Sequence, residues 1–356
     1  MNYKLQRYAC LAALSIPVLL GGWAAVAQPK PNEELVIVTW GGSLGDQLRE
    51  VLFRPFTAQT GIRIREDTGP QIERSRAEVQ SGKPSYDTTA TNLAFFLIGE
   101  AQNLWEPIDY TKFDPRDLEA LPADVRLPNG IGAYVYAHGM SFSAKAFPEG
   151  KPQPNSWADF WDVAKFPGKR TLADCGSATR PVPEAALLAD GVPMDKLYPI
   201  DIPRAAKKLK ELAPHVVWWK NPNQPGQFLA TGEVTMAMAP TNRIQALIDQ
   251  NVPLKIVWNQ SQWTFDIWYI LRGARNSAAA SRFFAFASQP EQQAKFAAVS
   301  AMAPTNPRAI DLIKPEVART LPTSPENFKV MYKKNEAWWE ANREKWTEAC
   351  LAALTP

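Results

Sequence analysis

An aspartate inside an otherwise apolar run is the feature of this sequence with the clearest chemical meaning. Asp266 lies within the segment 263–268, which reads WTFDIW. Burying a carboxylate is costly unless a cation or hydrogen-bond donors replace the lost water. We therefore expect Asp266 to bind the ammonium group of a ligand, with Trp263 beside it as an aromatic face. The alternative is an internal salt bridge, for instance to Arg243 or Arg272.

A glycine turn after the first predicted strand is a second candidate. Segment 35–43 reads LVIVTWGGS, and a predicted helix follows at 44–60. Glycines let the backbone approach a ligand, and a helix N-terminus offers free N–H groups. Gly42 and Ser43 are therefore candidate ligand contacts, and Asn92, which ends a later predicted strand, should lie at the same edge. The alternative is a tight turn that only requires positive φ angles.

Arg243 is the third candidate. It follows the segment 239–242 (APTN), where a predicted strand runs into a predicted helix. A guanidinium group at this place could hold a carboxylate through two parallel hydrogen bonds. The alternative is an exposed arginine at the start of a helix.

The sequence offers little that could support catalysis. It has two histidines, His138 and His215, and lacks the common hydrolase, nucleotide-binding and zinc-protease motifs. His138 lies in a strand-like run, which favours a structural role. We expect no catalytic residue, no cofactor and no metal site. An exported enzyme that uses His138 or Asp174 is the alternative from a different functional class.

The N-terminus has the pattern of an export signal. Lys4 and Arg7 precede an apolar run at 8–20, and Ala25-Val26-Ala27 has the small-residue spacing that signal peptidase cleaves. The run is too short to span a bilayer. We expect cleavage near Ala27 and a periplasmic protein.

The charge balance narrows the class of partner. The 356-residue chain has a formal net charge of +3, and part of that charge lies in the signal. A nearly neutral protein offers no electrostatic footprint for nucleic acid or for an anionic membrane. The two cysteines beyond the signal, Cys175 and Cys350, form either a disulfide, as an oxidising compartment permits, or two buried thiols.

Strand-like and helix-like segments alternate along the chain, which predicts a mostly parallel α/β fold. Segments 132–143 and 264–271 read as strands that cross between two lobes, and such crossings form a hinge with a ligand cleft. A long helix is expected at 326–351. We expect four parts: a signal peptide at 1–27, a first lobe of 28–132 plus 267–310, a second lobe of 133–266, and a C-terminal helical segment, 311–356, packed across the lobes.

The chain resembles the periplasmic substrate-binding proteins of ABC importers, and most of all the spermidine/putrescine-binding type. The resemblance runs in order along nearly the whole chain and rests on 56–62 (FTAQTGI), 155–161 (NSWADFW), 166–169 (FPGK), 265–266 (FD) and 304–306 (PTN). It implies a two-lobe α/β fold with a ligand between the lobes, delivery to a membrane permease, and a monomeric receptor.

The resemblance also suggests ligand contacts. Trp40 matches an aromatic wall of the family and Asp266 its amine-binding aspartate, while the family's aromatic after the strand that follows Asp87 falls at Ala94 or Phe95. The acidic pair of the second lobe has no clear match, with Asp174 and Glu184 as candidates. We therefore expect a receptor for a small amine such as putrescine or spermidine. The alternative is a receptor for an anion or a zwitterion such as 4-aminobutyrate, centred on Ser43 and Arg243.

Overall fold

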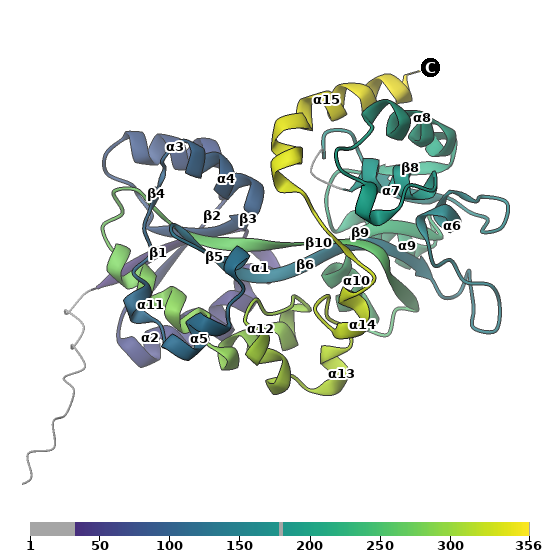
Figure 1. Cartoon of the computed structure of the whole chain (residues 1–356). Helices are drawn as coiled ribbons and strands as arrows, with labels where there is room; N and C mark the ends of the chain where they lie inside the picture. The colour runs from purple at the N-terminus through teal and green to yellow at the C-terminus, as the bar shows by residue number, and fades with distance from the viewer. Residues whose placement is uncertain (1–32, 178–180, 356) are drawn as a thin grey trace, which may run out of the picture.

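A computed structural model describes residues 33–177 and 181–355 of the chain. The expected signal segment, 1–27, lies outside the described residues. Two lobes lie side by side, and strands β6 (Gly130–Ser143) and β10 (Leu254–Leu271) run from one lobe into the other (Figure 1).

One mixed sheet of 11 strands joins both lobes, with its main path in the order β2-β1-β3-β10-β6-β9-β7-β8. The remaining strands are β1 (Glu34–Thr39), β2 (Arg63–Thr68), β3 (Thr88–Asn92), β4 (Trp105–Glu106), β5 (Arg126–Leu127), β7 (Arg170–Ala173), β8 (Val216–Trp219), β9 (Met236–Pro240) and β11 (Tyr332–Lys333). The outer strands pair in parallel, as predicted, whereas β10 is antiparallel to both β3 and β6. The antiparallel centre arises because β6 and β10 cross the lobe boundary in opposite directions.

Helices cover both faces of the sheet in each lobe (Figure 1). They are α1 (Gly42–Leu48), α2 (Arg54–Thr60), α3 (Ile72–Gln80), α4 (Leu93–Ala101), α5 (Pro115–Ala120), α6 (Trp157–Trp161), α7 (Val182–Ala189), α8 (Ile202–Leu212), α9 (Gln224–Thr231), α10 (Thr241–Ile248), α11 (Ser277–Ala287), α12 (Pro290–Ser300), α13 (Pro315–Ala318), α14 (Pro325–Phe328) and α15 (Glu336–Leu354). A π-helical turn, Arg49–Phe53, joins α1 to α2.

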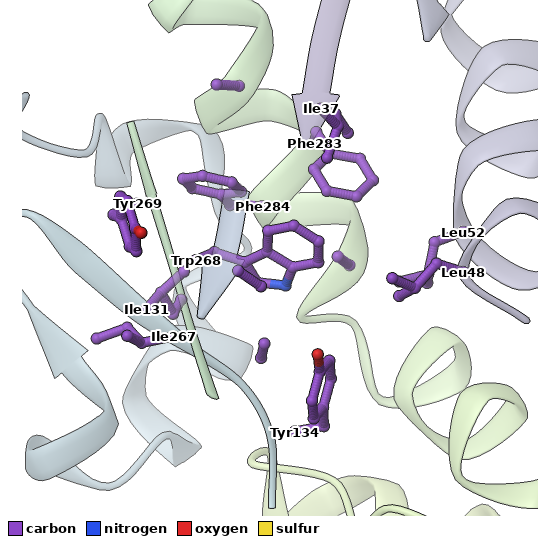
Figure 2. Close-up of a cluster of buried hydrophobic side chains, with 14 of the residues drawn as sticks. Ile37, Leu48, Leu52, Ile131, Tyr134, Ile267, Trp268, Tyr269, Phe283 and Phe284 are labelled. Atoms are coloured by element: carbon purple, nitrogen blue, oxygen red, sulfur yellow. The ribbon is translucent and has the colours of Figure 1, made fainter. Parts of the chain in front are cut away.

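The first hydrophobic core packs α11 against the carboxyl-terminal half of β10. Trp268 of β10 contacts Phe283 edge-to-face, with ring centroids 5.3 Å apart, and stacks on Phe284 (Figure 2). Ile37 of β1 and Ile267 of β10 are fully buried in the same cluster. This core holds one end of β10 rigidly in the first lobe.

The second hydrophobic core includes α7, α8 and α15. Tyr332, Trp339 and Trp346 are all buried in it, at the seven-residue spacing seen in the sequence. The prediction of one helix over 326–351 was wrong, because Tyr332 and Lys333 pair with β10 as strand β11. The helix begins only at Glu336, where the Asn335 side chain accepts a hydrogen bond from the Trp338 N–H and caps it.

The strand predicted at 264–271 is longer than expected, because β10 already begins at Leu254. It continues through the polar residues before Trp263, with a register irregularity against β6 between Val257 and Gln262. Gln260 within this stretch has a positive φ angle of 60°. A bulge of this kind bends a strand, and here it lies where β10 enters the second lobe.

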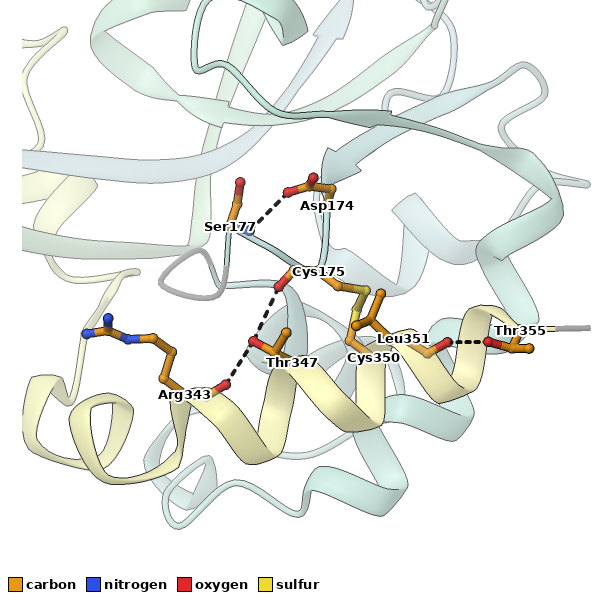
Figure 3. Close-up of a disulfide and its surroundings, with 8 residues drawn as sticks. All are labelled: Asp174, Cys175, Ser177, Arg343, Thr347, Cys350, Leu351 and Thr355. Carbon is orange, nitrogen blue, oxygen red and sulfur yellow. Dashed lines mark hydrogen bonds between the residues drawn. A yellow bond between two sulfur atoms is a disulfide. The ribbon is translucent and has the colours of Figure 1, made fainter.

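A disulfide joins Cys175 and Cys350, whose Cα atoms are 5.7 Å apart (Figure 3). It links the segment after β7 to the last turns of α15. The Thr347 hydroxyl also bonds the Cys175 carbonyl oxygen. Of the two alternatives for this cysteine pair, the structure thus contains the cross-link.

We predict that the double substitution Cys175→Ser and Cys350→Ser lowers the free energy of unfolding by about 2–5 kcal/mol, because the bond closes a long loop in the unfolded chain. Urea unfolding followed by tryptophan fluorescence measures the change. The wild-type protein in reducing agent is the control and should match the variant. Equal stability of oxidised and reduced wild-type protein would contradict this account.

Candidate functional site

A cavity of about 520 Å³ lies between the lobes. Trp40, Leu44, Asn92 and Met302 line it from the first lobe, and Asn221, Asn223, Pro240 and Arg243 from the second. The wall also includes Tyr134, Tyr136 and His138 of β6, Thr264 and Asp266 of β10, and Lys334. Four of the predicted ligand contacts, Trp40, Asn92, Arg243 and Asp266, thus share one cavity.

Backbone pairing at the centre of the sheet brings the polar groups together. Asp266 is the direct partner of Asn92 in β3 and of Tyr134 in β6. Thr264, two residues earlier on the same face, is paired with Tyr136. Because side chains alternate along a strand, this register directs the cavity-lining side chains of β6 and β10 to one face.

Asp266 is 7% exposed and accepts a hydrogen bond of 3.0 Å from the Tyr134 hydroxyl. Burial raises the pKa of Tyr134 well above its usual range, and the nearby Asp266 carboxylate raises it further. Tyr134 is therefore a neutral donor that orients Asp266 toward the cavity. Arg272, one of the cations considered for an internal pair, instead donates to the carbonyl oxygens of Asn103 and Trp105.

Arg243, near the start of α10, reaches across the lobe boundary. Its Nη1 donates to the Ser43 hydroxyl of α1 at 2.9 Å. Partial burial lowers its pKa, and the neighbouring Tyr134 acts in the opposite direction. The guanidinium retains further N–H donors for a ligand, since it carries five. Ser43 thus contacts Arg243 and lies beside the cavity without lining it.

The glycine turn shapes the wall rather than supplying its surface. Gly41 and Gly42 have φ angles of 68° and 58°, so the turn needs glycine. It leaves Trp40 46% exposed in the cavity wall. Phe95 lies behind Trp40, with ring centroids 6.5 Å apart, and the Asn92 side chain caps α4 by accepting from the Phe95 N–H.

Trp263 lies away from the cavity. Its ring packs against Phe328 at 5.0 Å, and the Lys333 ammonium lies over it. The alternation of β10 explains this position, because Trp263 and Asp266 point to opposite faces of the strand. Gly42, Ser43, Phe95 and Trp263 are therefore the predicted residues that the cavity wall does not include.

Several wall residues escaped the sequence prediction. Tyr134, Tyr136 and His138 follow one another at every second position of β6. This period-two pattern marks one face of a strand and could have been read from the sequence. Lys334 could not, because its place depends on how the C-terminal segment pairs with β10.

A second buried carboxylate lies on α7, behind the cavity wall. Oε1 of Glu184 accepts from Tyr198, Gln262 and Trp339 at 2.6, 3.0 and 2.7 Å. Its Oε2 has no hydrogen-bond partner within the described ranges. Burial raises the pKa of Glu184, and the hydrogen bonds from Tyr198 and Trp339 act against that shift only in part. Glu184 thus ties α7 and α15 to β10.

Residues 33–177 and 181–355 contain neither a cluster of metal ligands nor a membrane-spanning helix. No group of three or more His, Cys, Asp or Glu side chains in these ranges could hold a metal ion. None of the helices there is both long and apolar enough to cross a bilayer.

Comparison with known proteins identifies the family. Residues 52–323 match the family described as bacterial extracellular solute-binding protein. The chain belongs to this family.

Individual relatives agree with the family match. A gamma-aminobutyric acid-binding protein of Pseudomonas aeruginosa is 32% identical, and the alignment covers 91% of each chain. A putrescine-binding periplasmic protein of the same species is 24% identical over 88% of this chain and 89% of its own. A solved ABC transporter substrate-binding protein from Bradyrhizobium japonicum is 35% identical and covers 91% of this chain and 100% of its own, with a TM-score of 0.82.

These findings define the class of this solute-binding protein. It has the two-lobe fold of the periplasmic binding proteins and is a receptor of the ABC-transporter type. Its relatives are binding proteins rather than enzymes.

We predict that Glu184→Gln stabilises the protein, and more so as the pH rises. The pKa of Glu184 is higher in the folded than in the unfolded chain, so the folded chain binds this proton more tightly. The protein therefore loses stability as the pH rises above about 4.3, the ordinary pKa of a glutamate. At pH 7.5 the variant should be more stable by about 1–3 kcal/mol, and at pH 4 the difference should shrink.

Urea unfolding at both pH values measures this effect. Glu340→Gln, an exposed change on α15, is the matched control and should follow the wild-type protein. A Glu184→Gln effect of the same size at both pH values would show that the carboxyl carries no folded-state shift.

Proposed function

We propose that this receptor binds a small zwitterion of the 4-aminobutyrate type, with the ammonium at Asp266 and the carboxylate at Arg243. The observation that supports this most is the pair of opposite charges in one cavity. Asp266 and Arg243 both line it. Tyr134 donates a hydrogen bond to Asp266 and lies close enough to Arg243 to affect the pKa of its guanidinium. A ligand with an ammonium at one end and a carboxylate at the other would complement both of these charges.

The charge count argues against a polyamine as the preferred ligand. Among the described residues that line the cavity, Asp266 is the one carboxylate, whereas Arg243 and Lys334 are cationic. A diamine would need a second acceptor and would meet like charge instead. The relative that binds gamma-aminobutyric acid is also more similar to this chain than the putrescine-binding one. The preference for polyamines is therefore replaced by the zwitterion alternative.

Aromatic side chains would hold the amine end of the ligand. Trp40 of the first lobe and Tyr136 of β6 line the cavity, and aromatic faces attract cations. Since Trp40 and Arg243 belong to opposite lobes, a ligand that touches both would favour closure around β6 and β10. The Arg243 guanidinium would then donate hydrogen bonds both to the Ser43 hydroxyl and to the ligand carboxylate.

We further propose that the signal at 1–27 directs export and is removed near Ala27. The mature receptor is a periplasmic monomer that delivers its ligand to a membrane permease. The boundaries at 132/133 and 266/267 separate the lobes at the crossing strands, and 311–356 packs across both lobes. The two hydrophobic cores, one on either side of these crossings, support that division.

Titration calorimetry of the mature protein tests the proposal. We expect 4-aminobutyrate to bind more tightly than putrescine, spermidine or simple carboxylates, because only the zwitterion complements both charges. Tighter binding of putrescine than of 4-aminobutyrate would contradict the assignment.

Two substitutions test the roles of the charges. Asp266→Asn and Arg243→Met should each weaken binding of 4-aminobutyrate at least about tenfold, since each leaves one ligand charge without its partner. Asp249→Asn is the matched control, because Asp249 is the exposed residue that directly follows α10 and lies outside this cavity. Unchanged affinity in Asp266→Asn, with an unchanged melting temperature, would refute its role.

A further inference from the structure

A buried ion pair lies in the wall of the ligand cavity. The Lys334 ammonium is 2.6 Å from Oε2 of Glu336, and the two side chains are 5% and 3% exposed. The Thr264 hydroxyl donates to the other carboxylate oxygen of Glu336 at 2.8 Å. Removing two charges from water often costs more than their attraction returns. A pair at this position therefore suggests a function beyond stability.

The C-terminal segment places this pair next to the ammonium site at Asp266. Strand β11 pairs with β10 at Gln262 and Trp263, and the backbone N–H of Lys334 then donates to the Trp263 carbonyl oxygen at 3.0 Å. Lys334 thus lies beside Thr264. Thr264 and Asp266 are two residues apart on one strand face, a separation of roughly 7 Å. This is the scale of a short α,ω-diamine.

The surroundings of the Lys334 ammonium are those that a ligand ammonium requires. Glu336 supplies a carboxylate, and the Trp339 ring lies 5.9 Å away as an aromatic face. Lys334 lines the cavity, whereas Glu336 lies behind it. The lysine therefore separates a buried carboxylate from the ligand space.

We propose that Lys334 fills, from within the chain, the place of a second ligand ammonium, so that the receptor accepts one amine and excludes diamines. The inference rests on the proposed function and adds a specificity-determining residue to it. A tethered ammonium competes for Glu336 at a high effective concentration, which a free ligand cannot match. Its charge also repels a second ammonium in the cavity, and such a repulsive element is a common source of specificity.

The test is to remove the internal ammonium and measure diamine binding. In Lys334→Ala, Glu336 would face the cavity without a cation. Calorimetry with putrescine, cadaverine and 4-aminobutyrate should show the affinity for a diamine, relative to 4-aminobutyrate, rising at least about tenfold. The double variant Lys334→Ala, Glu336→Gln should lose that gain, because the second acceptor charge is then absent.

Lys333→Ala is the matched control. Lys333 is the neighbouring lysine, it pairs with Asp124, and it lies outside the cavity wall. The ligand selectivity of the Lys333→Ala variant should equal that of the wild-type protein. If Lys334→Ala does not fold, Lys334→Met retains most of the apolar stem, and a diamine should raise the melting temperature of that variant.

The outcomes separate this inference from the proposed function. Wild-type protein that binds no amino acid of the 4-aminobutyrate type refutes the proposed function. Wild-type protein that binds 4-aminobutyrate, together with Lys334→Ala and Lys334→Met variants that gain no diamine affinity, refutes the inference alone. A change in ligand selectivity of the same size in Lys333→Ala would also overturn the inference, because the loss of either lysine charge would then have the same effect.

Discussion

The register of β10 between β3 and β6 is the constraint on which the ligand cavity depends. One residue of β10, Asp266, is aligned with Asn92 on one side and with Tyr134 on the other. A slip of one residue would turn Asp266 to the opposite face, where Trp263 now lies. Large buried side chains on both sides oppose such a slip, among them Trp268 in the first lobe (Figure 2). The hydrophobic core thus holds the polar site in place.

The same strand also links the site to the rest of the molecule. β10 passes from the second lobe to the first and pairs with β11. Its Thr264 and Gln262 side chains donate hydrogen bonds to the Glu336 and Glu184 carboxylates. α15, which carries Glu336 and Trp339, is fixed at its far end by the disulfide to Cys175 (Figure 3). The C-terminal segment therefore takes part in the ligand cavity as well as in the packing of the second lobe.

Many features of the fold and of the candidate site could be predicted from local sequence. The apolar run around Asp266, the glycine turn after β1 and the crossing strands are short-range patterns, and the structure contains each of them. The strand alternation that directs Trp263 away from Asp266 was equally available, and it was missed. The position of Lys334 and the late start of the C-terminal helix, at Glu336, could not be predicted, because they depend on strand pairing between residues far apart in the chain.

Ligand preference was the hardest property to infer, since it depends on the sum of charges around one cavity. A buried aspartate alone suggested an amine, and only the presence of Arg243 and Lys334 in the same wall favours a zwitterion. Family membership alone leaves both ligands open, because one relative is a gamma-aminobutyric acid-binding protein and another is a putrescine-binding protein.

A crystal structure of the mature protein with 4-aminobutyrate tests the central claim most directly. The account predicts the ligand ammonium within hydrogen-bond distance of the Asp266 carboxylate and the ligand carboxylate on the Arg243 guanidinium, with the Lys334–Glu336 pair intact. A ligand bound in the reverse orientation, or one that contacts neither Asp266 nor Arg243, would contradict it.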